Sequence, residues 1–371
     1  MNLDLVLKVF GMPKALISRN TLILFLLINS SIASSQFITD DSVNFLFIGN
    51  SYTHMNNMPG IFDKIAKAKG RKVHVEKNTQ SGASFQVHTE RLDLYESIKS
   101  KQWDFIVLQG YSRELSYSIS HIDSVSVPFI NQLIDTIKRY HTCVNLVFYN
   151  TWGYKNGFIE REEIDSFEKM QDSIIKGYKY LSDSLVIPIV PVGMVWRNVV
   201  NSNPKLNLYK DDNEHPNKVG SYLAACTFYS AFYQDSPEGV ITSTISSENA
   251  KIVQRESFKY VITHFDNLKL NNNRSSLSYY RTSDVKYIVE CKSNYSEALC
   301  VMWEFGDGEI SSSNNPIHNY KKPGKYKVKL YIEDVCGERE FEQKISFSKP
   351  KKPKKPKKSE PVIVPVDKKK I

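Results

Sequence analysis

Short apolar runs alternate with longer amphipathic stretches from Val43 to about Ala231, and few folds accommodate such an alternation. The apolar runs have the length of buried strands and cover residues 43–48, 105–108, 144–149 and 186–191. The amphipathic stretches have the apolar spacing of helices and cover residues 59–69, 126–140, 161–181 and 216–233. This order predicts an α/β domain with a three-layer α/β/α architecture, in which a parallel sheet forms the middle layer.

The pattern changes after a further helical stretch at residues 246–263. Residues 266–275 are rich in Asn and polar side chains, which predicts a linker. Apolar and polar residues then alternate with period two in short segments, at residues 287–291, 299–305 and 325–332. This period predicts a small antiparallel β-sandwich over residues 276–348. Lys-Lys-Pro repetition in residues 349–371 predicts an extended, disordered tail.

The net charge of +9 does not indicate a nucleic-acid-binding protein, because most of it lies in this tail. Residues 349–371 contain ten lysines against Glu360 and Asp367, a net charge of +8, which leaves +1 for the rest of the chain. The folded part is therefore nearly neutral and lacks the charge of a polyanion-binding groove. We expect no nucleic-acid partner.

Residues 1–35 have the order of segments expected of a secretory signal peptide. Basic residues come first, at Lys8, Lys14 and Arg19, and an apolar stretch follows at residues 22–28. A run of small residues ends the segment at residues 32–35. Cleavage is expected just before Gln36, and Met12 is an alternative start of the chain. We expect a secreted, periplasmic or cell-surface protein, and no segment is long and apolar enough to predict a membrane span.

Five cysteines are an odd number for an oxidising compartment. Cys291, Cys300 and Cys336 lie in the predicted sandwich, where their number allows one disulfide and the pairing stays open. Cys143 and Cys226 are expected to be buried small apolar residues.

Ser51 directly follows the first predicted strand in Gly49-Asn50-Ser51-Tyr52-Thr53, which predicts a hydroxyl above the carboxyl edge of the sheet. Such a serine alone is equally typical of a turn or a helix cap. Near the end of the same domain, Asp212-Asn213-Glu214-His215-Pro216 places a carboxylate and an imidazole on one loop. A serine nucleophile needs an imidazole as base and a carboxylate to orient that imidazole. We therefore predict a Ser51–His215–Asp212 triad, with Asp211 as an alternative to Asp212.

Further blocks occur in order between these motifs: Gln80-Ser81-Gly82-Ala83-Ser84, Trp103-Asp104-Phe105-Ile106-Val107-Leu108-Gln109, Tyr149-Asn150-Thr151-Trp152 and Pro191-Val192-Gly193. Together the blocks resemble the SGNH/GDSL hydrolase superfamily, in a branch with G-N-S-[FY]-T in place of G-D-S-L. The resemblance runs from about Val43 to Phe232 and implies a hydrolase domain over residues 41–265. It implies that Ser51 attacks an ester carbonyl while His215 acts as base and then as acid. No metal or cofactor is expected, and the sequence contains no zinc-binding or nucleotide-binding motif.

The resemblance also implies an oxyanion hole formed by the backbone N–H groups of Ser51 and Gly82 and a side-chain amide. Most of the superfamily supplies this amide from the Asn of a Gly-x-Asn-Asp block. Here the corresponding strand ends in Leu108-Gln109-Gly110-Tyr111-Ser112, so Gln109 is the predicted third donor and Ser112 the alternative. Asn50, His54 and Trp152 are predicted in the substrate pocket, although Asn50 also suits the turn and Trp152 also suits packing on the sheet.

Three blocks in the C-terminal part resemble the polycystic kidney disease (PKD) type of immunoglobulin-like domain: Trp303-Glu304-Phe305-Gly306-Asp307-Gly308, Pro316-Ile317-His318-Asn319-Tyr320 and Gly324-Lys325-Tyr326-Lys327-Val328-Lys329-Leu330. The resemblance implies a structural role for their aromatic residues, with weak contact to polysaccharide or protein.

The combined interpretation is a secreted serine esterase that hydrolyses acetyl esters on carbohydrate. Two alternatives remain open at this point: a non-catalytic surface adhesin that binds glycans on the same scaffold, and an acyltransferase that uses the same triad. The motifs do not specify the acyl group or the alcohol of the substrate.

Overall fold

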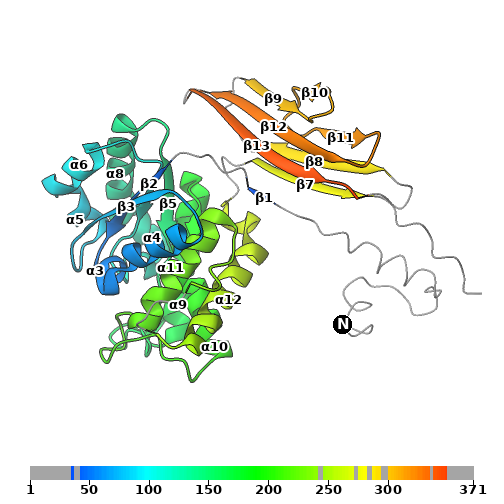
Figure 1. Cartoon of the computed structure of the whole chain (residues 1–371). Helices are drawn as coiled ribbons and strands as arrows, with labels where there is room; N and C mark the ends of the chain where they lie inside the picture. The colour runs from blue at the N-terminus through cyan, green and yellow to red at the C-terminus, as the bar shows by residue number, and fades with distance from the viewer. Residues whose placement is uncertain are drawn as a thin grey trace, which may run out of the picture.

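The computed structural model describes residues 35–36, 42–240, 245–270, 275–281, 286–293, 300–334 and 337–348. These residues form two separate hydrophobic cores, one in an α/β domain and one in a β-sandwich (Figure 1). The predicted signal peptide, apart from Ser35, and the predicted Lys/Pro tail lie outside the described residues. No helix in the described ranges is long and apolar enough to cross a membrane.

The α/β domain is built on a five-stranded parallel sheet with strand order β3-β2-β4-β5-β6, which confirms the predicted fold class. The strands are β2 (Val43–Gly49), β3 (Val73–Thr79), β4 (Phe105–Leu108), β5 (Asn145–Tyr149) and β6 (Ile189–Val190). Strand β6 is shorter than predicted, because Val186 has the left-handed φ of 54° that ends helix α9 (Phe167–Leu185).

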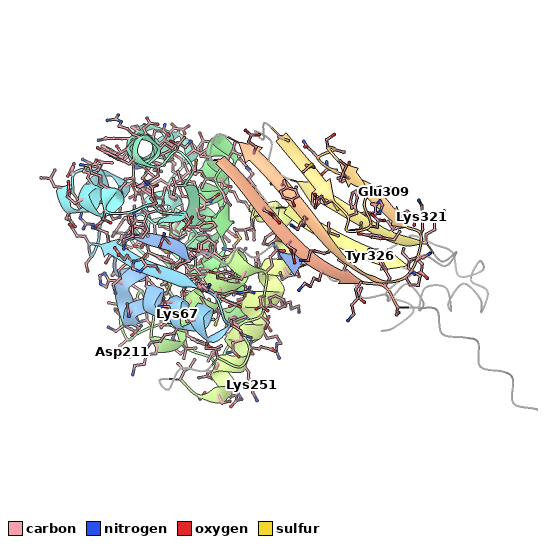
Figure 2. All side chains as sticks on the ribbon, turned by 45° about the horizontal axis from the view of Figure 1, so that its top comes forward. Lys67, Asp211, Lys251, Glu309, Lys321 and Tyr326 are labelled. Atoms are coloured by element: carbon pink, nitrogen blue, oxygen red, sulfur yellow. The ribbon has the colours of Figure 1, made fainter. Side chains whose placement is uncertain are left out.

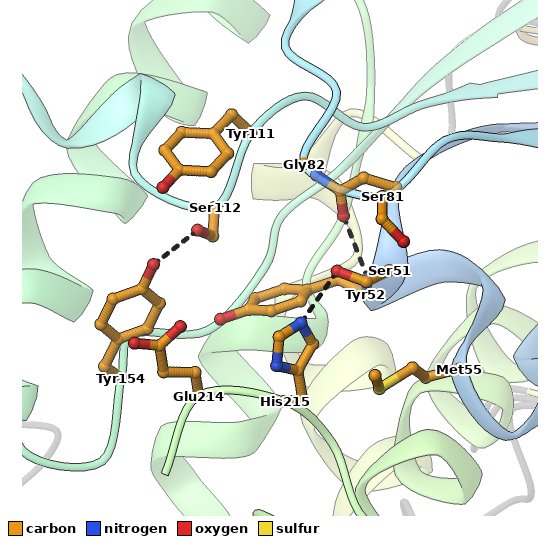
Figure 3. A pocket seen from close by; sticks show the side chains of 11 residues that line it. Ser51, Tyr52, Met55, Ser81, Gly82, Tyr111, Ser112, Tyr154, Glu214 and His215 are labelled. Atoms are coloured by element: carbon orange, nitrogen blue, oxygen red, sulfur yellow. Dashed lines mark hydrogen bonds between the residues drawn. The ribbon is translucent and has the colours of Figure 1, made fainter. Parts of the chain in front are cut away.

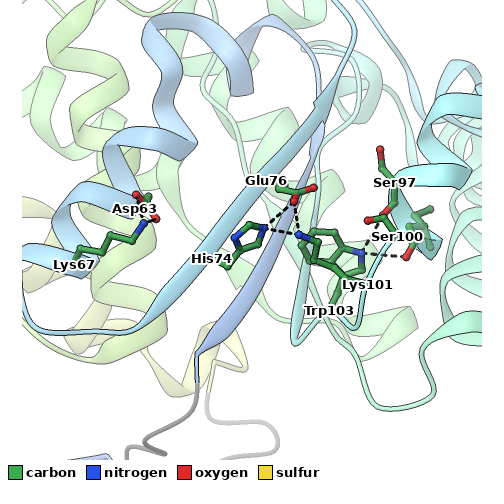
Figure 4. Close-up of polar contacts among 9 residues, drawn as sticks. Asp63, Lys67, His74, Glu76, Ser97, Ser100, Lys101 and Trp103 are labelled. Atoms are coloured by element: carbon green, nitrogen blue, oxygen red, sulfur yellow. Dashed lines mark hydrogen bonds and ion pairs between the residues drawn. The ribbon is translucent and has the colours of Figure 1, made fainter.

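Strand β3 was not predicted, and its place at the edge of the sheet explains why. Figure 4 shows its side chains His74 and Glu76 in contact with Lys101. The Lys101 Nζ lies 2.5 Å from Glu76 Oε1 and 2.7 Å from His74 Nε2. An edge strand that faces solvent carries polar residues and lacks the continuous apolar run of an interior strand.

Helices cover both faces of the sheet, as adjacent aromatic residues of β5 demonstrate. Side chains of neighbouring strand residues point to opposite faces. Tyr149 packs edge-on against Phe228 of helix α11 (Lys218–Tyr233), whereas Phe148 packs edge-on against Tyr178 of helix α9. Helix α4 (Met58–Ala68) lies on the α11 face, because Phe62 contacts Phe228.

The longer helices lie close to their predicted positions: α4 (Met58–Ala68), α8 (Val127–Tyr140), α9 (Phe167–Leu185), α11 (Lys218–Tyr233) and α12 (Ser247–His264). Helix α9 starts later than predicted, because Ser166 caps it by accepting a hydrogen bond from Lys169 N at 3.4 Å. The remaining helical segments are α3 (Ser51–His54), η2 (Met55–Asn57), α5 (Phe85–Thr89), α6 (Leu92–Lys99), η3 (Glu114–Ser116), α7 (Ile119–His121), η4 (Ile122–Ser126), η5 (Glu162–Ile164) and α10 (Val192–Ser202).

The C-terminal part consists of two antiparallel sheets, with strand orders β1-β7-β8-β11 and β10-β9-β12-β13, which confirms the predicted sandwich. The strands are β1 (Ser35–Gln36), β7 (Ser275–Arg281), β8 (Tyr287–Ser293), β9 (Cys300–Glu304), β10 (Ile310–Ser311), β11 (Ile317–Tyr320), β12 (Lys325–Asp334) and β13 (Gly337–Ser346). Trp303, Phe305 and Tyr320 are buried in its core, and the Tyr320 hydroxyl donates to Phe305 O at 2.8 Å.

The predicted linker at residues 266–275 is not wholly separate from the α/β domain. Asp266–Leu268 form the 3-10 helix η6, and Leu268 and Leu270 are buried in the α/β core. Strand β7 then begins at Ser275, the last residue of the predicted linker and one residue before the predicted start of the sandwich.

The expected burial of Cys143 is wrong, while burial of Cys226 is confirmed. Cys143 is exposed and disulfide-bonded, because it lies in the loop after α8 and not inside the following strand. Cys291 and Cys300 carry free thiols, so no disulfide forms among the three C-terminal cysteines. Cys336 lies outside the described residues.

Candidate active site

A sharp turn after β2 places Ser51 at the carboxyl edge of the sheet. Asn50 caps the short helix α3, and its Oδ1 accepts a hydrogen bond from Tyr52 N at 3.0 Å. The turn requires glycine at position 49, because a Cβ there would lie 2.3 Å from Thr53 Oγ1 and 2.5 Å from Gln109 Oε1. The cap and the glycine together hold Ser51 as the first residue of α3, with only 8% of its surface exposed.

The three predicted triad residues lie in one hydrogen-bonded chain (Figure 3 shows its serine and histidine). The Ser51 Oγ lies 2.9 Å from His215 Nε2. On the other side of the imidazole, His215 Nδ1 lies 3.0 Å from Asp212 Oδ2. Asp211, the alternative carboxylate, is exposed at the surface (Figure 2). The structure thus brings Ser51, His215 and Asp212 together in the order needed for proton transfer.

Backbone donors anchor the Asp212 carboxylate. Its Oδ1 accepts hydrogen bonds from His215 N at 2.8 Å and from Glu214 N at 2.9 Å. Partial burial by itself would raise the pKa of Asp212, but these N–H donors and the His215 ring outweigh it and lower that pKa. Asp212 is therefore ionised at neutral pH and available to stabilise a positively charged imidazole.

A pocket of about 480 Å³ opens in front of Ser51 (Figure 3). It is lined by Asn50, Ser51, Tyr52, Met55, Ser81, Gly82, Tyr111, Ser112, Tyr154, Glu214 and His215. These residues come from the loops that follow β2, β3, β4 and β5 and from the loop that carries His215. The pocket therefore lies at the carboxyl ends of the strands, where ligand sites of parallel sheets are found.

Two backbone N–H groups at this pocket are left for a ligand. Within the described part of the chain, neither Ser51 N nor Gly82 N donates a hydrogen bond to a protein group. Gly82 has a φ of +71°, which favours glycine. Ser51 N belongs to the first turn of α3, whose donors have no partner within the helix.

The structure does not bring the predicted third donor, Gln109, to the pocket. Its side chain is fully buried, and its Oε1 accepts from Asn50 N at 2.9 Å and from Thr53 Oγ1 at 2.7 Å. Its Nε2 donates to Gly110 O. Gln109 thus braces the turn behind Ser51, because all of its polar atoms already have protein partners. Ser112, the alternative, does line the pocket.

Of the three predicted pocket residues, only Asn50 lines the pocket. Trp152 is fully buried and stacks between Tyr52 and Trp196, with ring centres 4.4 Å and 4.1 Å away. Its indole N–H donates to Glu214 O at 3.0 Å, so Trp152 supports the loop that carries His215 from behind. His54 follows Ser51 on α3 but is not among the pocket-lining residues.

One wall of the pocket was missed by sequence reasoning. Ser112 Oγ lies 2.9 Å from the hydroxyl of Tyr154, and Glu214 points toward the same wall (Figure 3). Burial raises the pKa of Tyr154 to about 12, so its hydroxyl stays protonated at neutral pH. Glu214 belongs to the Asp212–Pro216 block, and Tyr154 lies two residues after the block that ends at Trp152, so these positions were the available signal. The pocket therefore presents hydroxyl groups and a carboxylate to a ligand.

Among the residues with described positions, no group of three or more His, Cys, Asp or Glu side chains is placed to hold a metal ion.

Comparisons with known proteins agree with this architecture. The family model of the PKD domain matches residues 283–348. The crystal structure of a DUF4886 family protein from Bacteroides uniformis has a TM-score of 0.54 and 20% identity, and it covers 61% of this chain and 96% of its own. A protein from Slackia heliotrinireducens assigned to the SGNH hydrolases has a TM-score of 0.41 and 22% identity, covering 51% of this chain and 98% of its own.

Among curated proteins, collagenase ColA of Clostridium perfringens is 23% identical over 349 residues, which is 86% of this chain. The match takes in 26% of the collagenase, so the chain spans about a quarter of the length of that relative. The chain thus consists of an α/β domain that shares its fold with the DUF4886 family protein and a β-sandwich whose residues 283–348 match the PKD domain family.

Proposed function

We propose that this protein is a serine hydrolase that cleaves carboxylic esters, with Ser51 as the nucleophile. The observation that carries the proposal is the hydrogen-bonded chain from Ser51 Oγ through His215 to Asp212, with distances of 2.9 Å and 3.0 Å. These are the distances over which a base accepts a proton from a serine hydroxyl.

In the first half of the reaction, His215 Nε2 takes the proton of Ser51 while Ser51 Oγ bonds to the acyl carbon. The bond from that carbon to the alcohol oxygen then breaks, and His215 gives the proton to the leaving alcohol. In the second half, His215 takes a proton from water, and the resulting hydroxide attacks the acyl-serine. The carboxylic acid leaves, and Ser51 recovers its proton from His215. Asp212 stabilises the imidazolium in both halves.

The negative charge on the carbonyl oxygen develops next to the free N–H groups of Ser51 and Gly82. Donors fixed in advance stabilise this charge in the transition state more than they stabilise the substrate. Ser112 Oγ is a side-chain hydroxyl that lines the same pocket and is the third donor in this proposal.

The proposed substrate is an acetylated carbohydrate. The hydroxyl groups of Ser81, Ser112 and Tyr154 and the carboxylate of Glu214 offer hydrogen-bond partners to a sugar. A long acyl chain would leave these polar groups without partners, which costs free energy. The expected signal peptide and the PKD domain extend the proposal to a secreted enzyme that acts on an extracellular glycan.

The test uses the mature protein with p-nitrophenyl acetate and a fluorophosphonate probe. Ser51→Ala is expected to abolish both hydrolysis and labelling, whereas the exposed Ser247→Ala is expected to preserve both. Hydrolysis retained by Ser51→Ala would exclude Ser51 as the nucleophile. A wild-type protein that neither hydrolyses the ester nor takes the probe would favour the adhesin alternative.

A further inference from the structure

One partly buried carboxylate beside the pocket has no role in the steps above. Glu114 is the first residue of η3 and does not line the pocket. Both of its oxygens accept from Phe85 N, at 3.1 Å and 3.2 Å, and Oε2 also accepts from Tyr111 N at 2.8 Å. The carboxylate therefore joins two segments that are far apart in sequence.

These two segments lead to different parts of the pocket wall. Phe85 lies three residues after Gly82, on the loop that follows β3. Tyr111 is itself a lining residue and precedes Ser112, on the loop that follows β4. Glu114 binds the backbone of both loops. It therefore sets the distance between the part of the wall that contains Gly82 (the Gly82 wall) and the part that contains Ser112 (the Ser112 wall).

Asn50 makes a parallel connection between the same loops. Its Nδ2 donates to Gly110 O at 2.9 Å and to Ala83 O at 3.3 Å. Glu114 accepts from the two N–H groups and Asn50 donates to the two carbonyls, so the loops are held through both kinds of backbone group. The fit is close, since a Cβ on Gly110 would lie 2.4 Å from Glu114 Oε2.

Among the residues that the structure describes, no Lys, Arg or His forms an ion pair with the Glu114 carboxylate. Burial raises its pKa to about 7, although the N–H groups of Tyr111 and Phe85 and the Ser126 hydroxyl favour the ionised form. Tyr178 faces Glu114 from α9. The pKa of the Tyr178 phenol is raised, mainly by burial and to a smaller extent by the negative charge of Glu114. On α5, burial lowers the pKa of His88 to about 4, so this ring is neutral.

Arg113, the cationic residue next to Glu114 in sequence, contacts two aromatic side chains. Arg113 donates to the Tyr111 hydroxyl at 2.8 Å, and its guanidinium lies 3.6 Å from the centre of the Phe158 ring. The backbone N–H groups are thus the main partners of the Glu114 carboxylate.

We propose that Glu114 is a positioning residue of the active site, which holds the Gly82 and Ser112 walls at the separation that ester hydrolysis needs. The proposal rests on the proposed function. Protonation turns one acceptor oxygen of the clamp into a donor, so the ionised form holds both N–H groups better than the protonated form.

The variants for the test are Glu114→Gln, Glu114→Ala and the control Glu163→Gln, a change at an exposed carboxylate that does not line the pocket. With p-nitrophenyl acetate, Glu114→Gln is expected to lower kcat about tenfold, the loss of about one charge-assisted hydrogen bond, with KM changed less than about twofold. In a plot of kcat against pH, the decrease toward acid pH should follow the titration of one group in Glu114→Gln, because position 114 no longer carries a group that titrates near pH 7.

A second measurement needs no enzyme activity. Hydrogen exchange of the full protein is expected to be at least about tenfold faster at the amides of Phe85 and Tyr111 in Glu114→Ala, and unchanged in Glu163→Gln. If Glu114→Ala does not fold, the kcat and the pH profile of Glu114→Gln test the proposal.

The proposal is wrong if folded Glu114→Gln has the same kcat and pH profile as the wild type. It is also wrong if hydrogen exchange at both amides is unchanged in folded Glu114→Ala. Absence of hydrolysis by the wild type would instead overturn the proposed function, and the exchange measurement would still decide whether Glu114 holds the loops.

Discussion

The charge of Asp212 is expected to account for a large part of the turnover rate, and Asp212→Asn isolates it. The amide has nearly the same shape, and its oxygen can keep the backbone hydrogen bonds from Glu214 N and His215 N. The NH₂ group then faces His215 Nδ1, so the ring must carry its proton on Nε2. In that tautomer His215 has no lone pair for the Ser51 proton.

The magnitude follows from the geometry. The contact of 3.0 Å between His215 Nδ1 and Asp212 Oδ2 places the centres of two delocalised charges about 4 Å apart, an attraction of about 4 kcal/mol near a protein surface. The Asp212 side chain is 43% exposed, and solvent screening reduces this to about 2–3 kcal/mol. The charge alone therefore supports a decrease in kcat of about 30- to 150-fold, and the wrong tautomer adds to it.

The assay is steady-state hydrolysis of p-nitrophenyl acetate by the purified mature protein, with the neighbouring Asp211→Asn as matched control. Asp211→Asn is expected to keep wild-type kcat, because Asp211 is an exposed residue beside the triad chain and not part of it. A decrease of less than about fivefold in Asp212→Asn would refute the reasoning. A larger decrease in Asp211→Asn than in Asp212→Asn would assign the carboxylate role to Asp211.

Two further variants test the parts that support the triad. Gly82→Ala is expected to lower the free energy of unfolding by about 1–2 kcal/mol, because φ at this position is +71° while a Cβ would meet nothing within 4 Å. Urea denaturation measures this cost, and an unchanged midpoint would contradict it. Trp152→Ala is expected to lower the free energy of unfolding by about 3–5 kcal/mol, because the side chain is fully buried between Tyr52 and Trp196. The exposed Tyr117→Ala is the aromatic control, and equal losses in the two variants would show that burial is not the cause.

The sheet was predictable wherever a strand is covered on both faces. Strands β2, β4 and β5 are interior strands, and their apolar runs stand out against the polar turns around them. Strand β3 pairs with β2 alone at the edge of the sheet, so its sequence, Val73-His74-Val75-Glu76, reflects contact with solvent. Helix positions were predictable to within a few residues, and capping by Ser166 decided the start of α9.

Short-range order in the sequence was also enough to nominate the triad. Asp212 and His215 lie on one loop, and the pairing of a carboxylate with an imidazole three residues later follows from local geometry. Ser51 belongs with them only if the carboxyl ends of distant strands meet at one edge, and the predicted parallel sheet implies that they do.

Local patterns along the chain were enough to predict the α/β layers, the sandwich, and the residue types of the proposed nucleophile, base and orienting carboxylate. Contacts between distant segments set three further features: Gln109 turns inward to brace Asn50 and Thr53, Trp152 stacks behind the pocket, and Tyr154 lines it. The physical reason is that a side chain's direction depends on which partners satisfy its polar atoms and fill the space around it. Those partners come from segments far away in the chain, so no local pattern encodes them.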